Sequence, residues 1–233
     1  MTAGIFSSCM KETNVPTKTV QEVKQETTSP LANARKGKSK ADGVEPNTDV
    51  VIVPADLSTI LTQSTLTAGQ NYDAGTVTVG IYEDPKDNHH QQYFTIIMDV
   101  TATDWVVGTS HIYVGGYDAA PINGGGNPQI GQFPHGSGDI ALGDILTDMN
   151  AGGGAYGGGT VIYTIPLENI DFYTNASGQT CYMTMIHAEV HNVVDDGSGT
   201  YTSIASETAW GSGSALNQGG AGGSWAMYNE LCL

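Results

Sequence analysis

Apolar and polar residues alternate along several short stretches in the middle of the chain. In Thr76–Tyr82, the residues Val77, Val79 and Ile81 fall on one face of an extended backbone, and Tyr93–Val100 repeats the pattern. A period of two residues is typical of an antiparallel sheet with one dry face. Other apolar or β-branched stretches predict further strands at Val50–Val53, Ser58–Thr65, Trp105–Val107, His111–Val114, Val161–Ile165, Cys181–Val193, Thr200–Ser206 and Ser224–Leu231.

Together these stretches predict an all-β fold, an antiparallel two-sheet β-sandwich of about nine or ten strands. One helical turn is expected near Leu142–Met149. Two glycine-rich stretches, Gly115–Gly138 and Gly152–Gly159, are too long to be simple turns. Loops of that length often carry function, so we expect both to contribute to ligand binding.

The first 48 residues differ in composition from the rest of the chain. Residues 1–9 resemble the end of a bacterial lipoprotein signal peptide, with Cys9 as the lipidated residue, although they lack the basic residues that begin such a peptide. Residues 10–48 are polar and nearly free of large apolar side chains, which predicts a flexible linker. Residues 49–233 are then the β-sandwich domain. The alternative is an ordinary N-terminal segment with an unrelated cysteine.

The net charge is −16, and every lysine and arginine except Lys86 lies before Ala41. A body this acidic repels phosphate backbones, so nucleic acid is excluded as a partner. The plain interpretation is a soluble, self-repelling surface of an exported protein. Hard cations prefer carboxylate and carbonyl oxygens, so calcium is the cofactor that this composition favours, ahead of zinc.

Cysteines number three. If Cys9 carries lipid, Cys181 and Cys232 remain, both near the ends of predicted strands. Exported proteins meet an oxidising compartment, so we predict a disulfide between these two residues. The alternative is a pair of free buried thiols.

The predicted strand Cys181–Val193 carries His187, Glu189 and His191 on one face. Two imidazoles and a carboxylate are zinc ligands in many proteins, and a further ligand would have to come from His111 or Glu207. The alternative is that His187 packs in a polar pocket while Glu189 and His191 face solvent. A nucleophilic serine in a G-x-S-x-G turn is not found in the sequence, so no serine triad is expected and no catalytic residue is assigned.

Seven short blocks stand out along the chain from residue 111 onward. In order they are His111–Val114, Gly126–Pro128, Gly131–Pro134, Tyr163–Leu167, Ile186–Ala188, Glu207–Gly211 and Trp225–Tyr228. Together they resemble a β-sandwich module of bacterial and archaeal secreted or cell-surface proteins, which ends in a similar E-T-A-W-G … W-A-x-Y block. The resemblance covers roughly residues 72–230 and implies a fold and a location but no reaction.

Within these blocks, His111, His187 and Glu207 are each embedded in apolar strand sequence. A buried carboxylate must find partners, and an imidazole is an efficient one. We therefore predict a structural polar cluster of His111, His187 and Glu207 covered by Trp210.

The function expected from the sequence is that of a binding module on the cell envelope, at the outer membrane or cell surface, anchored to the membrane through lipid on Cys9. Its extracellular ligand would be a glycan, a protein or a matrix component. One alternative is a metal-dependent hydrolase using the strand face of His187, Glu189 and His191. Another is a subunit of a surface assembly whose edge strands pair with neighbours.

Overall fold

The computed structural model describes residues 52–86, 89–152, 159–216 and 225–233. Cys9, the linker 10–48, Val50 and Val51, residues 153–158 of the second glycine-rich stretch and Ser224 lie outside the described residues. The strands are β1 (Thr59–Ala68), β2 (Tyr72–Glu83), β3 (Gln92–Asp99), β4 (Trp105–Gly115), β5 (His135–Gly136), β6 (Thr160–Pro166), β7 (Tyr173–Thr174), β8 (Thr180–Asp195), β9 (Tyr201–Gly211), β10 (Ser214–Ala215) and β11 (Met227–Cys232). The helices are α2 (Leu142–Asn150) and the short 3-10 turns η1 (Pro54–Asp56), η2 (Tyr117–Ala119), η3 (Ile130–Gln132) and η4 (Leu167–Asn169).

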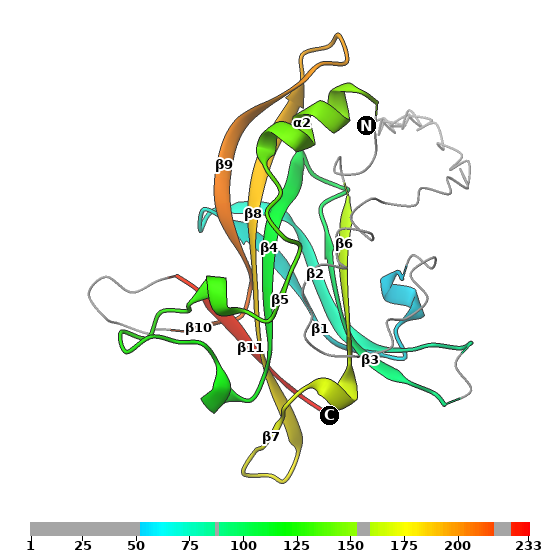
Figure 1. Ribbon diagram of the computed structural model, residues 1–233, viewed down its shortest axis with the longest axis vertical. Helices are drawn as coiled ribbons and strands as arrows, with labels where there is room; N and C mark the ends of the chain where they lie inside the picture. Colours follow the sequence, from blue (N-terminus) through cyan, green and yellow to red (C-terminus); the bar gives the residue numbers. More distant parts are fainter. Residues whose placement is uncertain (1–51, 87–88, 153–158, 217–224) are drawn as a thin grey trace, which may run out of the picture.

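All the described strand pairs are antiparallel, and they join into one hydrogen-bonded sheet in the order β10-β11-β8-β9-β1-β2-β3-β6, with β4 and β7 also paired to β8 and β5 to β4 (Figure 1). The all-β class is thus confirmed, whereas the separation into two sheets is not. The reason is β9, which pairs with β8 along most of its length and then with β1 through Ala209, Trp210 and Gly211. The sheet therefore curls instead of splitting.

The curl brings two halves of the sheet face to face around the main apolar core. Val77, Val79 and Ile81 of β2 and Phe94 of β3 point into it, as the alternation predicts. They meet Ile186 and other apolar residues of β4, β8 and β9. At the far edges of the curl, Ser110 Oγ of β4 lies 2.7 Å from Tyr163 Oη of β6, and both residues are buried. This hydrogen bond joins the two ends of the curled sheet.

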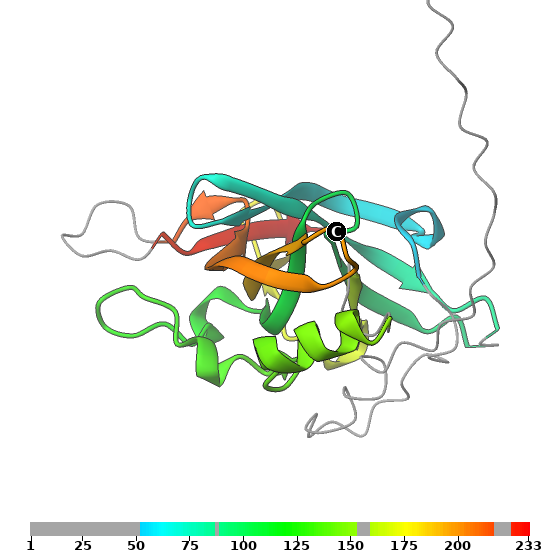
Figure 2. The ribbon, with the colours of Figure 1, turned by 90° about the horizontal axis from the view of Figure 1, so that it is seen from above.

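A third layer covers the outer face of β4, β8 and β9 (Figure 2). It consists of α2 and the segment 116–141, so the predicted helical turn is confirmed as a helix. Under α2, the residues Ile145, Val106 and Val193 form a small apolar cluster. Under the rest of the segment, a second cluster gathers Tyr113, Phe133, Met183, Met185, Trp210 and Ala226. The polar residues of β8 lie between these two clusters.

The prediction of two separate short strands at Trp105–Val107 and His111–Val114 is wrong, because both belong to the single strand β4. Its register against β8 shifts between Val107 and Ser110, which is a β-bulge. Ile52 and Val53 are not part of a strand. Instead, Ile52 is buried against Tyr82, Tyr93 and Ile97 on the outer face of β2 and β3.

Candidate functional site

Three of the four residues of the predicted polar cluster lie side by side on the outer face of the sheet. Strand pairing places His111 of β4 opposite His187 of β8, and His187 opposite Trp210 of β9. The ring centroids of His111 and His187 are 5.8 Å apart. The indole of Trp210 meets the His187 ring edge to face at 4.9 Å. The cluster of His111, His187 and Trp210 is therefore a row across three strands.

Burial sets the charge of this row. The His187 side chain is only 5 % exposed, and its pKa falls to about 4 because burial penalises the charged form and because His111 lies beside it. Among the described residues, the Nδ1 atoms of both histidines are buried and have no hydrogen-bond partner. His187 is thus a neutral ring packed against an aromatic neighbour, which suits a structural role better than proton transfer at neutral pH.

Glu207 does not belong to this cluster, and the predicted histidine–carboxylate network is not formed. On β9 it lies opposite Val190, so it points to the face opposite to Trp210 and His187. Residues three apart on a strand always point to opposite faces. The carboxylate lies instead beside the turn between β1 and β2, where a Cβ on Gly69 would come within 2.8 Å of Glu207 Oε2.

His187, Glu189 and His191 do share one face of β8, but they do not converge. His191 Nδ1 lies 2.8 Å from Ser206 Oγ on β9, and its Nε2 is buried next to Gly108. Glu189 is exposed, as one alternative expected, whereas His191 is buried. The side chains of His187, Glu189 and His191 do not form a group whose ligand atoms lie within 4.8 Å of one another. The zinc site predicted on this strand face is therefore not assembled in the part of the chain that the structure describes.

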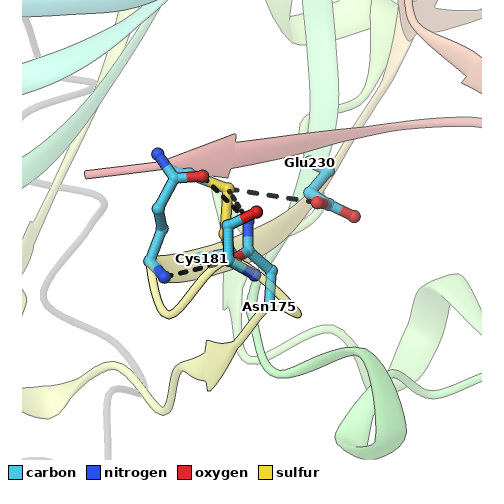
Figure 3. Close-up of a disulfide and its surroundings, with 6 residues drawn as sticks. Asn175, Cys181 and Glu230 are labelled. Carbon is cyan, nitrogen blue, oxygen red and sulfur yellow. Dashed lines mark hydrogen bonds between the residues drawn. A yellow bond between two sulfur atoms is a disulfide. The ribbon is translucent and has the colours of Figure 1, made fainter.

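The predicted disulfide between Cys181 and Cys232 is present (Figure 3). The two residues are direct partners in the pairing of β8 with β11, and their Cα atoms are 4.0 Å apart. Asn175 and Glu230 lie against the bridge, with Asn175 Nδ2 at 3.8 Å and Glu230 Oε1 at 3.9 Å from Cys232 Sγ. This is the one place in the described ranges where ligand atoms of three Cys, His, Asp or Glu side chains lie within 4.8 Å of one another.

A hollow of about 800 Å³ opens where the end of α2 meets the hairpin between β8 and β9. Asn150, the last residue of α2, holds the two elements together. The Tyr201 N–H donates to Asn150 Oδ1 at 2.5 Å, and Asn150 Nδ2 donates to the Tyr201 carbonyl oxygen at 3.3 Å. The hollow is lined by Thr103, Asp104, Val106, Met149, Asn150, Gly152, Val193, Val194, Asp195, Gly199 and Tyr201.

The walls of this hollow mix apolar and polar groups. Val106 and Val193 belong to the apolar cluster under α2. The carboxylates of Asp104 and Asp195 belong to exposed residues and add hydrogen-bond acceptors. Pockets that hold small ligands are of this size and combine an apolar lining with a few polar groups. The hollow is therefore a surface depression that combines apolar walls with a few hydrogen-bonding groups.

The hollow could not be predicted from the sequence, because its lining residues form no sequence motif. Its residues come from the loop before β4, from α2 and from both strands of a hairpin, and none of them forms a motif. The nearest signal was the glycine-rich stretch Gly152–Gly159, whose first residue is part of the lining. Glu230 likewise gave no signal, because its closeness to both cysteines depends on strand pairing.

Comparison of the chain with descriptions of protein families, with curated proteins and with solved structures found no significant match. The resemblance to a secreted surface module accordingly remains a prediction, and the site has to be argued from its own geometry. Within the described residues, no helix is long and apolar enough to cross a membrane.

Proposed function

We propose that this protein is a binding module of the cell envelope, held to the membrane by lipid on Cys9, and that its ligand occupies the hollow between α2 and the β8–β9 hairpin. The observation that carries the proposal is the hollow itself, which has a volume of about 800 Å³. Cavities of this size accept small molecules or a few sugar units.

The chemistry of the walls favours a carbohydrate among the ligands expected of a surface module. A sugar presents hydroxyl donors together with apolar ring faces. Asp104 and Asp195 supply carboxylate acceptors for the hydroxyls, and the Tyr201 side chain is the aromatic group of the lining. Val106 and Val193 supply the apolar surface. A phosphorylated ligand fits poorly, because Asp104 and Asp195 are acidic and the lining contains no lysine or arginine.

The proposed location rests on three features. Residues 1–9 resemble the end of a lipoprotein signal peptide, and the linker 10–48 has the composition of a flexible tether. The disulfide between Cys181 and Cys232 suits a compartment outside the reducing cytosol. Together they support a folded body that is displayed at some distance from the membrane.

Binding is tested by screening the protein against a panel of oligosaccharides and measuring the affinity of each hit by calorimetry. Asp104→Asn and Tyr201→Ala are expected to weaken binding at least tenfold, because each removes a wall group that contacts the sugar. Phe172→Ala is the matched control. Phe172 is an exposed aromatic residue next to β7, at the end of the molecule opposite to α2 (Figure 1). If Phe172→Ala weakened binding while the two wall variants did not, the ligand would not occupy the hollow.

Anchoring is tested separately, in a bacterium that expresses the complete gene. Cys9→Ser is expected to abolish incorporation of radiolabelled fatty acid into the protein, because Cys9 is the cysteine of this segment and its thiol is the group that carries the lipid. Unchanged labelling of Cys9→Ser, or no labelling of the parent, would refute the lipid anchor and leave the binding site untouched.

A further inference from the structure

We propose that reduction of the Cys181–Cys232 disulfide creates a zinc site whose three protein ligands are Cys181, Cys232 and Glu230. The inference does not depend on the proposed ligand hollow, because the two sites use different residues at different ends of β8. It starts from the three side chains shown at the bridge in Figure 3.

Strand pairing brings these three ligands to one face of the sheet. Cys232 lies opposite Cys181, and Glu230 lies opposite Met183 in the same pairing of β11 with β8. Glu230 and Cys232 are two residues apart, so their side chains point to the same side of β11. The intervening Leu231 points the other way, into the main core. The ligand atoms of Cys181, Glu230 and Cys232 all lie within 4.8 Å of one another as a result.

Glu230 is also held in place by its surroundings. Tyr173 of β7 makes a side-chain hydrogen bond to Glu230. The phenol O–H donates this bond to the carboxylate, which is an acceptor. On the other side of the bridge, Asn175 Nδ2 donates toward Cys232 Sγ at 3.8 Å, an arrangement that also suits a thiolate.

The disulfide must break before a metal binds, because the thiolate is the ligand and a disulfide sulfur is not. A dithiol reductant, whether a thioredoxin-like protein or dithiothreitol, transfers two electrons and two protons to the bridge and is itself oxidised to a disulfide. Binding of Zn²⁺ then releases the two thiol protons. Cysteine thiolates are soft ligands, so they select zinc rather than calcium.

The distances that zinc requires are within reach of this arrangement. Zinc–sulfur bonds of about 2.3 Å and zinc–oxygen bonds of about 2.0–2.2 Å place tetrahedral ligand atoms roughly 3.5–3.8 Å apart. The three ligand atoms already lie within 4.8 Å, and the β8–β11 ladder holds their backbones together without the disulfide. Glu230 is exposed and Cys232 is partly buried, so the ion approaches from that side. One coordination position stays open to solvent.

The consequence is a cross-link that survives a change in redox conditions. In the oxidised protein a covalent bond ties β11, which ends at Cys232, to β8. In the reduced protein the zinc ion would tie the same two strands through the same two sulfurs. Zinc is thus expected to stabilise the reduced protein and to leave the oxidised protein unaffected.

The test uses the full chain with Cys9→Ser, so that only the two strand cysteines remain. The protein is reduced with dithiothreitol under anaerobic conditions, the reductant is removed, and Zn²⁺ is titrated in competition with a chromophoric chelator. The reduced protein is expected to bind one equivalent and the oxidised protein none. Cys181→Ser is expected to abolish tight binding. Glu230→Gln is expected to weaken it at least tenfold, since even groups outside the ligand set alter zinc affinity by about 10–100-fold.

Glu189→Gln is the matched control for Glu230→Gln. Glu189 is also an exposed strand carboxylate, but it lies on β8 beside the histidines rather than on β11 beside the cysteines. The control variant is expected to bind zinc as the parent does. Loss of binding in Glu189→Gln but not in Glu230→Gln would overturn the proposal and place the metal on the histidine face. Zinc binding by the oxidised protein would overturn it as well. Should the reduced chain unfold, zinc is expected to restore its circular dichroism and raise its melting temperature, and failure to do so would also refute the site.

Discussion

We expect the stability of the protein to fall on acidification because His187 is buried as a neutral ring. The imidazole is buried beside Trp210 and His111, and its pKa is lowered from 6.5 to about 4. Between pH 6.5 and pH 4, His187 is therefore protonated in the unfolded chain but neutral in the folded chain. The stabilisation is fully present above about pH 6.5 and is lost as the pH falls toward 4.

The size of the effect follows from the shift. Each pKa unit is worth about 1.4 kcal/mol, so the whole shift amounts to about 3 kcal/mol, of which about 2 to 3 kcal/mol falls between pH 7.5 and pH 4.5. His187→Leu replaces the ring with an apolar side chain of similar size and removes this proton uptake. Between pH 7.5 and pH 4.5, we expect the free energy of unfolding to fall by about 2 kcal/mol less in the variant than in the parent.

Urea unfolding at both pH values measures this difference. His135 and His191, whose pKa values burial also lowers, contribute to the remaining slope in parent and variant alike. His89→Gln, at an exposed histidine, controls for the loss of one imidazole. If His187→Leu lost as much stability on acidification as the parent does, the folded chain would accept a proton at His187, and the account of a neutral buried ring would be wrong.

Three further predictions concern the fold. Cys181→Ser combined with Cys232→Ser opens a loop spanning 51 residues and should lower the free energy of unfolding by about 4 kcal/mol in denaturant titrations under oxidising conditions; an unchanged midpoint would show that the bridge does not stabilise the fold. Ser110→Ala and Tyr163→Phe, which each break the hydrogen bond joining the ends of the curled sheet, should show a coupling of about 1 kcal/mol in a double-mutant cycle, whereas strictly additive effects would contradict that contact. Gly75→Ala should cost more than about 2 kcal/mol in thermal unfolding, because Gly75 has a φ of 145° and an added Cβ would lie 2.3 Å from a backbone oxygen; a neutral result would mean that the backbone yields at this position.

Much of the sheet was predictable because the burial of each strand follows a local rule. Val77, Val79 and Ile81 alternate with smaller or polar residues, and all three enter the main core. For the strands, neighbours in the sequence already carry the information. The disulfide was predictable for a different reason, since Cys181 and Cys232 are the two cysteines left near the ends of predicted strands and an exported protein meets an oxidising compartment.

The interruption predicted within β4 shows where local reasoning fails. Gly108, Thr109 and Ser110 look like a turn, but in the fold they belong to β4 and contact residues that are distant in the sequence. Gly108 leaves room for the ring of His191, and Thr109 Oγ1 accepts the Ile140 N–H at 2.9 Å. Ser110 bonds to Tyr163, more than fifty residues later in the chain. Partners so far apart in sequence are not visible in a local pattern.

Glu207 illustrates the same limit for the site. Its distance from the histidines is decided by the register of β9 against β8, which places it opposite Val190 rather than His187. A shift of one residue would reverse every side chain of β9, which would bring Glu207 to the face of the histidines but turn Trp210 away from it. Glu207 and Trp210 are three residues apart, so the two could not share one face of the strand in either register. The composition of the strand is equally compatible with either register. Only the paired structure distinguishes them.

The Glu207–Gly211 block lies at the corner of the sheet, where β9 passes from pairing with β8 to pairing with β1. The structure of this corner explains the residue types in the block. Trp210 covers His187 on the outer face, while Ala209 enters the core on the inner face. A Cβ on Gly211 would lie 3.3 Å from Ile186 Cβ, so a small residue lets the two halves of the sheet approach here. Since the corner accounts for a buried tryptophan, a small core residue and a glycine in succession, the distinctiveness of the block does not point to catalysis.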